Sequence, residues 1–444
     1  MRSSVFHTVT RARYPAPVYD PFDSSHTAPT PRCAPRTLAD IAGAFLRLGV
    51  ASFGGPVAHL GYFRTEFVER RRWLTDAAYA ELVALCQFLP GPTSSQVGFA
   101  IGLQRGGWAG AVLAWLGFTL PSALLLIALA LGLAQLDLRQ PALAGALHGL
   151  KLAAVAVVAH AVWGMARTLC PDAPRRTLAA LAAAIALAWS GPWAQWWLIV
   201  AAAAWGATGR IGQATGQPSA QAIAEANDAR GPANGAHQSL HAAAGWFAAF
   251  ILLLIGLPVL ARATGSAAAE LTAVFYRAGA LVFGGGHVVL PLLQAEVVPR
   301  GWLDLDTFLA GYGAAQAVPG PLFTFAAFVG AARSVAPNGW AGGLLALVTV
   351  FAPGMLVLLA ALPAWSRLRH LARARSALAA VNAAVVGLLL ATWLGLLRPS
   401  IGSAADVVIA LVATLALMST RVPPWLVALG CALAGAALAG WVPQ

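Results

Sequence analysis

Long runs of apolar residues, separated by short polar stretches, recur along the whole chain. Most of these runs approach the ~20 residues that a helix needs to cross the hydrocarbon core of a bilayer. Thirteen of them can be placed, at residues 42–61, 77–103, 108–134, 142–166, 177–190, 193–208, 244–261, 272–294, 306–332, 339–362, 377–397, 404–420 and 423–441. The pattern predicts an all-α, polytopic helical membrane protein with about 13 membrane segments.

Polar stretches divide these segments into two sets. Residues 1–37 are polar and rich in proline, and no apolar core follows their early arginines, so we expect a disordered cytoplasmic tail. Residues 209–243 are rich in Gly, Ala, Gln and Asn, which indicates a flexible linker. The linker separates a first membrane domain at 38–208 from a second at 244–442.

The same triplet interrupts two of the segments. Pro90-Gly91-Pro92 follows Gln87, and Pro319-Gly320-Pro321 follows Gln316, each inside an apolar run. Proline removes a backbone donor and clashes with the preceding turn, so neither helix continues through its triplet. In lipid, the freed backbone groups must be satisfied by protein or by a water-filled cavity. One break alone would indicate a kink, but two in matching places indicate the substrate site of a transporter, where helix N-termini favour an anion.

An internal duplication contains both triplets. At an offset of 230, residues 45–60 and 275–290 share seven identities in sixteen. At this offset Arg47 pairs with Arg277, Phe53-Gly54-Gly55 with Phe283-Gly284-Gly285, and Glu66 with Glu296. With one residue removed, the alignment pairs Gln87 with Gln316 and the two triplets with each other, and a later shift pairs Trp108 with Trp340 and Pro121 with Pro353. Gly286 stands where the first copy has Pro56. The chain is therefore expected to have two homologous halves.

Counting segments gives the expected orientation of the halves. Seven crossings lie between a segment and its repeat, so the halves should be inverted relative to each other. With the N-terminus in the cytoplasm, 17 Lys and Arg residues fall inside and 8 outside, as expected for a cytoplasmic N-terminus. Arg70-Arg71-Arg72 does not fit, because it would lie outside. If residues 42–61 and 272–294 are re-entrant, the charge count is unchanged and the halves become parallel; the inverted arrangement is preferred.

Composition and motifs exclude several function classes. Only 10% of residues are charged, against ~25% in a soluble domain. The net charge of +12 comes from arginines scattered through short loops, so it does not indicate nucleic-acid binding. The single lysine, Lys151, is not part of a P-loop, and no HExxH, GxSxG or nucleophile–base set indicates an enzyme. The four cysteines form no CxxC pair, and we expect no metal and no cofactor.

A few charged residues lie within or beside the apolar runs. Arg47 and Arg277 each lie seven residues before a Gly-Gly break, about 10 Å along a helix. A charge deep in a membrane helix costs roughly 2.5–3.5 kcal/mol, and keeping it in two equivalent places indicates a role in substrate binding. The alternative is that both arginines snorkel to an interface. Lys151 can anchor its helix or add charge to a cavity, and the anchor is slightly favoured. Glu66 and Glu296 are secondary candidates at segment ends.

Hydroxyl groups are distributed unequally between the halves. Thr93, Ser94 and Ser95 follow the first triplet, whereas Thr324 is the one hydroxyl residue directly after the second. If an oxyanion binds here, its hydroxyl contacts come mainly from the first half; the same groups can also cap the helix. His59 and His287 flank the glycine breaks but do not align, which favours structural roles.

Taken together, these motifs resemble the chromate ion transporter family in its long-chain, two-domain form, over about residues 38–442. The residues that carry the resemblance are Arg47, Gly54, Gly55, Pro56, Gln87, Pro90, Gly91, Pro92, Phe283, Gly284, Gly285, Gln316, Pro319, Gly320 and Pro321. The family implies chromate efflux across the bacterial inner membrane, chromate resistance, and sulfate as a competing anion. Arg277, Thr324 and the hydroxyls after Pro92 complete the candidate substrate-binding set.

The membrane potential favours export of such an anion. Moving two negative charges outward gains about 2 × 2.3 kcal/mol per 100 mV, and no ATP site is needed. An importer of sulfate or another oxyanion would have the same composition, and a non-transporting membrane scaffold is the remaining alternative. A homodimer is left open, and membrane lipid is the expected surrounding partner.

Overall fold

The computed structural model describes residues 38–135, 140–189, 192–209, 240–283, 285–365, 371–419 and 422–441. The predicted tail at 1–37, residues 210–239 of the predicted linker, and Gly284 lie outside the described residues. Within those ranges the regular structure is helical. Five helices are long and apolar enough to cross a membrane, namely α4 (Thr93–Gln135), α5 (Pro141–Leu169), α9 (Leu240–Thr264), α14 (Gly339–Ala361) and α16 (Ala372–Ser400). The prediction of an all-α polytopic membrane protein is confirmed, whereas the count of 13 segments is not.

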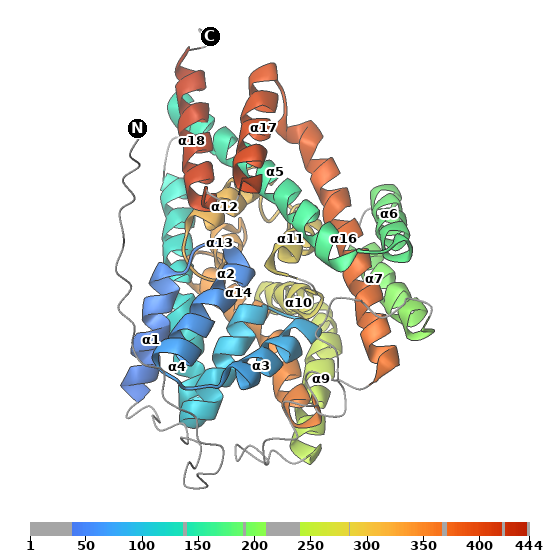
Figure 1. The fold of residues 1–444 in the computed structure, drawn as a ribbon. Helices are drawn as coiled ribbons and strands as arrows, with labels where there is room; N and C mark the ends of the chain where they lie inside the picture. The colour runs from blue at the N-terminus through green and yellow to red at the C-terminus, as the bar shows by residue number, and fades with distance from the viewer. Residues whose placement is uncertain are drawn as a thin grey trace, which may run out of the picture.

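The helices follow one another in two comparable series (Figure 1). The first half contains α1 (Leu38–Ala51), α2 (Gly55–Arg64), the π-helical turn η1 (Thr65–Arg70), α3 (Asp76–Phe88), α4 (Thr93–Gln135), α5 (Pro141–Leu169), α6 (Ala173–Ala188) and α7 (Pro192–Ala207). The second half contains α9 (Leu240–Thr264), α10 (Ala267–Ala280), η2 (Gly286–Val288), α11 (Val289–Val297), α12 (Leu305–Ala317), η3 (Leu322–Thr324), α13 (Phe325–Ala332), α14 (Gly339–Ala361), η4 (Leu362–Ala364), α16 (Ala372–Ser400), α17 (Ala404–Met418) and α18 (Pro424–Trp441).

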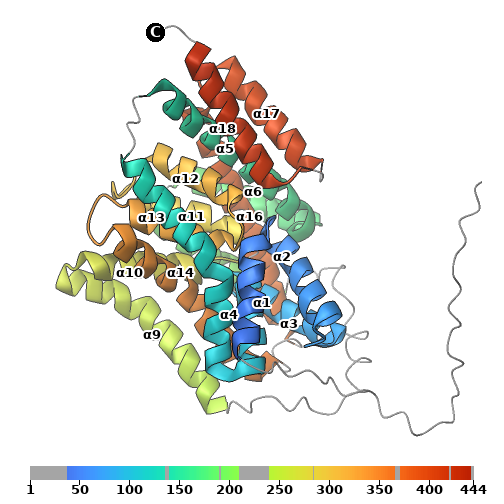
Figure 2. The same ribbon diagram turned by 90° about the vertical axis from the view of Figure 1, so that its left-hand side faces the viewer.

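The chain reverses direction at the first Gly-Gly break. Arg47 Nη2 lies 2.5 Å from Glu66 Oε1, although a straight helix would hold residues 19 apart about 28 Å from each other. The Phe45 and Phe63 rings also pack edge to face, 5.7 Å between centroids. Gly54 has φ +100° and Gly55 φ +78°, values that glycine adopts without a steric cost. The helices α1 and α2 therefore form a hairpin, and they lie side by side in Figure 2.

The first Pro-Gly-Pro triplet is the tip of a second hairpin. The helix α3 begins beside the end of α2, where Arg64 Nε donates to Asp76 Oδ1 at 2.8 Å. The first part of α4 returns toward the start of α1, because a Cβ on Gly106 would lie 2.9 Å from a methyl group of Leu38. Gly106 and Gly107 have non-helical dihedral angles, so α4 consists of two arms, residues 93–105 and 108–135. The second arm is long enough to cross the membrane.

The second half repeats this arrangement. An ion pair between Arg277 and Glu296 closes α10 against α11. Arg333 Nη1 donates to the Ala267 carbonyl at 3.3 Å, and the Ser334 N–H donates to the Trp302 carbonyl at 2.9 Å. We call the end of a hairpin that lies away from its turn the wide end. These bonds bring the wide ends of the α10/α11 and α12/α13 hairpins together on one side. The helix α14 then crosses, as the second arm of α4 does in the first half.

The two crossing helices that correspond to each other run antiparallel. A Cβ on Gly343 would meet Ile127 Cγ1 at 2.7 Å, and one on Gly339 would meet Leu131 at 3.8 Å. The start of α14 therefore lies beside the end of α4, and these corresponding elements have opposite orientations, as predicted.

The preferred explanation of that inversion was nevertheless wrong. It treated residues 42–61 and 272–294 as crossings, but each forms a hairpin, as in the re-entrant alternative. That alternative also failed, because it made the halves parallel. Residues 77–103 and 306–332 form hairpins as well. Of the seven crossings counted between corresponding helices, two are therefore hairpins, and the remaining number of crossings is still odd. Arg70-Arg71-Arg72 lies on the side where α1 begins. With a cytoplasmic N-terminus this basic loop therefore falls on the cytoplasmic side, and it is no longer an exception to the charge pattern.

The hairpins predict a specific labelling pattern. In a background without Cys33, Cys86, Cys170 and Cys431, a membrane-impermeant thiol reagent should reach Arg72→Cys from one face and Val335→Cys from the opposite face. Gly107→Cys should label from the same face as Arg72→Cys, because both lie at the wide ends of first-half hairpins. Labelling of Arg72→Cys and Val335→Cys from a single face would contradict the fold.

Candidate functional site

The tips of the four hairpins meet and exchange backbone hydrogen bonds. The Gly91 N–H donates to the Val282 carbonyl oxygen at 2.8 Å, and the Gly320 N–H donates to the Ser52 carbonyl oxygen at 2.9 Å. Ser52 and Val282 correspond at the offset of 230, so each triplet donates to the glycine break of the other half. The prediction that both triplets break their helices is confirmed, but the two glycine N–H groups are already occupied by protein.

Each triplet also packs against the crossing helix of the other half. Gly91 has φ +121°, and a Cβ there would lie 2.9 Å from Gly354 Cα. Gly320 has φ +110°, and a Cβ there would lie 2.7 Å from Ser122 Oγ. Gly354 and Ser122 directly follow the corresponding prolines Pro353 and Pro121. Both the dihedral angle and the close approach therefore require glycine.

The glycine-break tips touch as well. A Cβ on Gly286 would lie 3.6 Å from Pro56 Cγ and 3.6 Å from Leu322 Cβ. Gly286 occupies the position that corresponds to Pro56 of the first half, and these two residues face each other between the tips. Of the two glutamines that precede the triplets, Gln87 is exposed, whereas Gln316 is half-buried.

Gln96 ties the first triplet to the other half. Its Nε2 donates to the Pro90 carbonyl and to the Gly354 carbonyl, both at 2.9 Å, and the side chain is fully buried. The corresponding residue of the second half is Phe325, which cannot make these bonds. The two triplets are therefore similar in backbone geometry and different in polarity.

Buried hydroxyl groups gather at the first turn of α4. Ser94 and Ser95 are 3% and 2% exposed, and the N–H groups of a first helical turn have no partner within the helix. The oxygen of Ser94 lies 3.4 Å from Nδ1 of His59. We call Ser52, His59, Ser94 and Ser95 the first-tip polar cluster.

This cluster has unused hydrogen-bonding capacity. Among the described residues, Ser52 Oγ, Ser95 Oγ and His59 Nε2 have no hydrogen-bond partner. In the second half, Thr324 Oγ1 instead donates to the Pro321 carbonyl at 2.7 Å. The hydroxyls without a partner thus belong to the first half, and His59 lies beside them, a proximity that the sequence pattern did not reveal.

The arginines form ion pairs two helical turns from the tips. Glu66 is buried and receives Arg47, Arg70 and Arg71, with N–O distances of 2.5, 3.0 and 2.6 Å. Burial alone would raise the pKa of Glu66, but the hydrogen bond from Arg71 and the three positive charges lower it below its usual value. In the second half, Glu296 pairs with Arg277 and, at 2.5 Å, with Arg300. Both glutamates hold arginine side chains at the wide ends of hairpins.

Lys151 lies elsewhere. Its Nζ is 2.7 Å from Asp306 Oδ1, so it connects α5 to the first turn of α12. The structure therefore brings together the triplets, the glycine breaks and the first-half hydroxyls, and it leaves Arg47, Arg277 and Lys151 at a distance from them.

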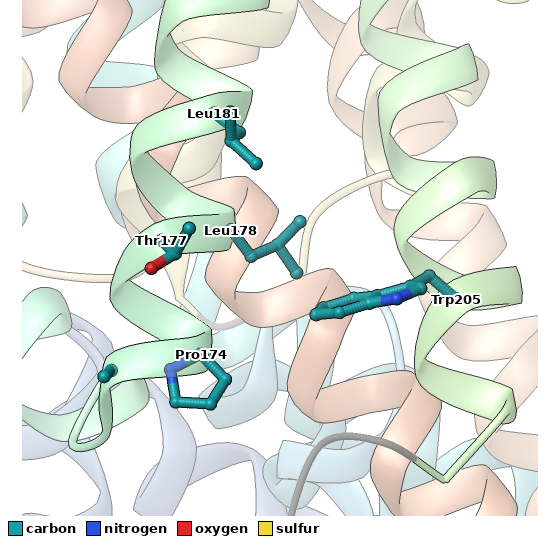
Figure 3. Close-up of a pocket in the computed structure, with 6 residues that line it drawn as sticks. Pro174, Thr177, Leu178, Leu181 and Trp205 are labelled. Carbon is teal, nitrogen blue, oxygen red and sulfur yellow. The ribbon is translucent and has the colours of Figure 1, made fainter.

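Two hollows in the described structure are lined mainly by apolar side chains. The larger, about 510 Å³, lies between α6 and α7 and is lined by residues such as Pro174, Leu178 and Trp205 (Figure 3). The second, about 330 Å³, includes Pro90 and Phe283 beside the tips. Such linings do not supply the donors and positive charge that an oxyanion requires.

Comparisons with known proteins agree with the duplicated organisation. A family model described as "Chromate transporter" matches residues 39–207 and again residues 269–436. The chain is 29% identical over 377 residues to the "Chromate transport protein" of Pseudomonas aeruginosa, covering 84% of this chain and 83% of that protein. It is 27% identical over 426 residues to the "Chromate transport protein" of Cupriavidus metallidurans, covering 93% and 94%. No solved structure matches the chain.

Substitution of the triplet glycines should strain the tips. Gly320→Ala should destabilise the protein by about 1–3 kcal/mol, because alanine at this positive φ is strained and its Cβ meets Ser122. The thermal unfolding midpoint of the detergent-solubilised protein measures this effect. Adding Ser122→Gly should recover part of the loss. Gly43→Ala is the control, because a Cβ there meets no atom within 4 Å; equal midpoints for Gly43→Ala and Gly320→Ala would contradict the tip geometry.

The two corresponding arginines should differ in their importance for stability. The Arg277 side chain is 12% exposed and that of Arg47 is 52% exposed. Breaking a buried pair costs about 3–5 kcal/mol, whereas an exposed pair contributes about 0–1 kcal/mol. Arg277→Gln should therefore lower the unfolding midpoint much more than Arg47→Gln. The exchange Arg277→Glu with Glu296→Arg should recover part of the loss; no recovery, with equal effects of the two single changes, would be evidence against structural pairing.

Proposed function

Because the chain belongs to the chromate transporter family, we propose that it exports chromate across a bacterial inner membrane and thereby confers chromate resistance. The observation that carries the proposal is the match of the family model to both halves. In the proposal the N-terminus is cytoplasmic, and the membrane potential, as part of the proton motive force, drives the outward movement of the anion.

Electrostatics supports the outward direction. Chromate is a dianion and the cell interior is negative, so export gains about 4.6 kcal/mol per 100 mV. Because 1.4 kcal/mol corresponds to a tenfold change in an equilibrium constant, this free energy sustains a ratio of ~10³ between the outside and inside chromate concentrations. Import of the same anion against this potential would need about three co-transported protons to make the electrical term favourable. A passive outward step of this kind requires no nucleotide site.

The proposed substrate site is the first turn of α4 with the first-tip polar cluster. Its helix N-terminus supplies N–H groups and the positive end of a helix dipole, which favour an anion. Ser94 and Ser95 supply buried hydroxyl groups, and hydroxyl donors suit a tetrahedral oxyanion. In this proposal Pro90, Gly91 and Pro92 set the direction of that helix, and the second triplet holds the opposite wall.

The arginines have an indirect role in this proposal. Arg47, Arg70 and Arg71 surround one carboxylate, so this group keeps a net positive charge on the side where α1 begins. A net charge of this kind raises the local concentration of anions and their association rate. Arg47 therefore attracts chromate toward the tips, while Arg277 mainly stabilises its hairpin.

Chromate flux in everted membrane vesicles tests the function. Everted vesicles that carry the protein should accumulate chromate, and dissipating a potential that is positive inside the vesicle should reduce the rate. Sulfate added in excess should compete. Accumulation that occurs only in right-side-out vesicles, or only of sulfate, would overturn the proposal in favour of an oxyanion importer.

Site variants in the same vesicles separate the halves. Ser94→Ala with Ser95→Ala should raise the chromate concentration for half-maximal flux by about tenfold, the loss of roughly 1.4 kcal/mol expected for charge-assisted hydrogen bonds. Thr324→Ala is the matched control and should change it little, because its hydroxyl is already bonded to Pro321. Fluxes are normalised to protein in the membrane. Equal effects of the two changes would contradict a site in the first half.

A further inference from the structure

His59 is the titratable side chain of the first-tip polar cluster. It lies on α2 one turn after Pro56, and only 1% of it is exposed. Its Nδ1 is 3.4 Å from the Ser94 oxygen, and its Nε2 has no partner among the described residues. Its ring lies perpendicular to the Phe118 ring, with 5.3 Å between centroids. A polarisable, protonatable group is thus held beside the first turn of α4.

The groups around His59 are uncharged. Ser52 directly follows α1 in the chain, and α4 contributes Ser94 and the Phe118 ring. Tyr79 of α3 is titratable, but its hydroxyl donates to the Leu60 carbonyl at 2.6 Å.

Charged side chains on the same elements are paired with one another. Arg47 pairs with Glu66, and Arg64 of α2 pairs with Glu69 and Asp76. The proposed oxyanion site therefore has hydrogen-bond donors nearby and, among the described residues that contact His59, no side chain with a permanent positive charge.

A buried dianion requires compensating charge. Removing charge from water is strongly unfavourable unless an opposite charge accompanies it. Hydroxyl groups and a helix N-terminus supply partial charges only. Histidine is the side chain whose charge changes between pH 5 and 8, so it can supply a full positive charge when the anion arrives and release it afterwards.

We propose that His59 takes up a proton when the oxyanion binds, so that the site holds one dianion and one imidazolium. The inference rests on the proposed function, because it assigns the charge balance of that same site. When His59 is neutral with its proton on Nε2, the Ser94 hydroxyl donates to Nδ1. When His59 is protonated, Nδ1–H donates to Ser94 instead, and the Ser94 hydrogen turns toward the substrate. One proton thereby frees the Ser94 O–H as a donor beside Nε2–H and adds a full positive charge to the imidazole.

Proton uptake by the wild-type protein is the primary test. Chromate binding to the purified protein is followed calorimetrically between about pH 7.5 and 9, where chromate itself is a dianion, in buffers of different ionisation enthalpy. We expect uptake of close to one proton per chromate, and a loss of affinity of up to about tenfold per pH unit as the pH rises. Binding without proton uptake across this range would overturn the inference.

Variants assign the proton to its residue. His59→Gln should bind chromate more weakly, without proton uptake and with an affinity that no longer depends on pH. His241→Gln, at an exposed position at the start of α9, is the matched control and should behave as the wild type. Ser94→Ala should weaken binding but keep the proton uptake. Undiminished uptake in His59→Gln would overturn the assignment.

The outcomes separate the two proposals. If wild-type vesicles transport chromate but binding takes up no proton, the assignment of His59 fails and the proposed function stands. If the wild-type protein neither binds nor transports chromate, the proposed function itself fails. Should His59→Gln not fold, the calorimetry of the wild type still decides whether a proton accompanies the anion.

Discussion

Every backbone polar group inside the hydrocarbon core needs a hydrogen-bond partner in the protein, and this constraint explains the centre of the molecule. In the part of the chain that the structure describes, eight short helical arms end near the centre of the molecule, at two glycine breaks and two Pro-Gly-Pro triplets. The exchanged bonds from Gly91 to Val282 and from Gly320 to Ser52 satisfy groups that these breaks expose. The partners of the Gly91 and Gly320 N–H groups belong to the opposite half, so each half completes the other at these two tips.

The sequence was sufficient to predict features that depend on local chemistry. Proline and glycine at Pro90-Gly91-Pro92 and Pro319-Gly320-Pro321 end helices wherever they occur, and the duplication was visible residue by residue. The reversals at the Gly-Gly breaks were not predictable in this way. An apolar run of about 20 residues fits one membrane crossing or two arms of half that length, and glycine permits both a kink and a turn. Length and composition therefore could not separate the alternatives.

The candidate site was predictable in part for the same reason. The hydroxyls after Pro92 are adjacent in sequence, so their grouping at one helix end was expected. The pairing of Arg47 with Glu66 and the contact of His59 with Ser94 both depend on a folded-back chain. Aligned glutamates at positions 66 and 296 carried the signal for the arginine pairs, since a duplicated carboxylate beside a duplicated arginine indicates a contact, whereas no such signal existed for His59 and Ser94. That signal could be interpreted only after the direction of α2 was known.

The exchange of bonds between the halves also has a consequence for biosynthesis. The first half leaves the ribosome well before Val282 and Gly320 exist, so the Gly91 N–H and the Ser52 carbonyl initially lack their final partners. The helix α1 has 14 residues, about 21 Å, which is shorter than the ~30 Å hydrocarbon core. The early hairpins therefore cannot settle in lipid on their own. The centre of the molecule can therefore be completed only after the second half has entered the membrane.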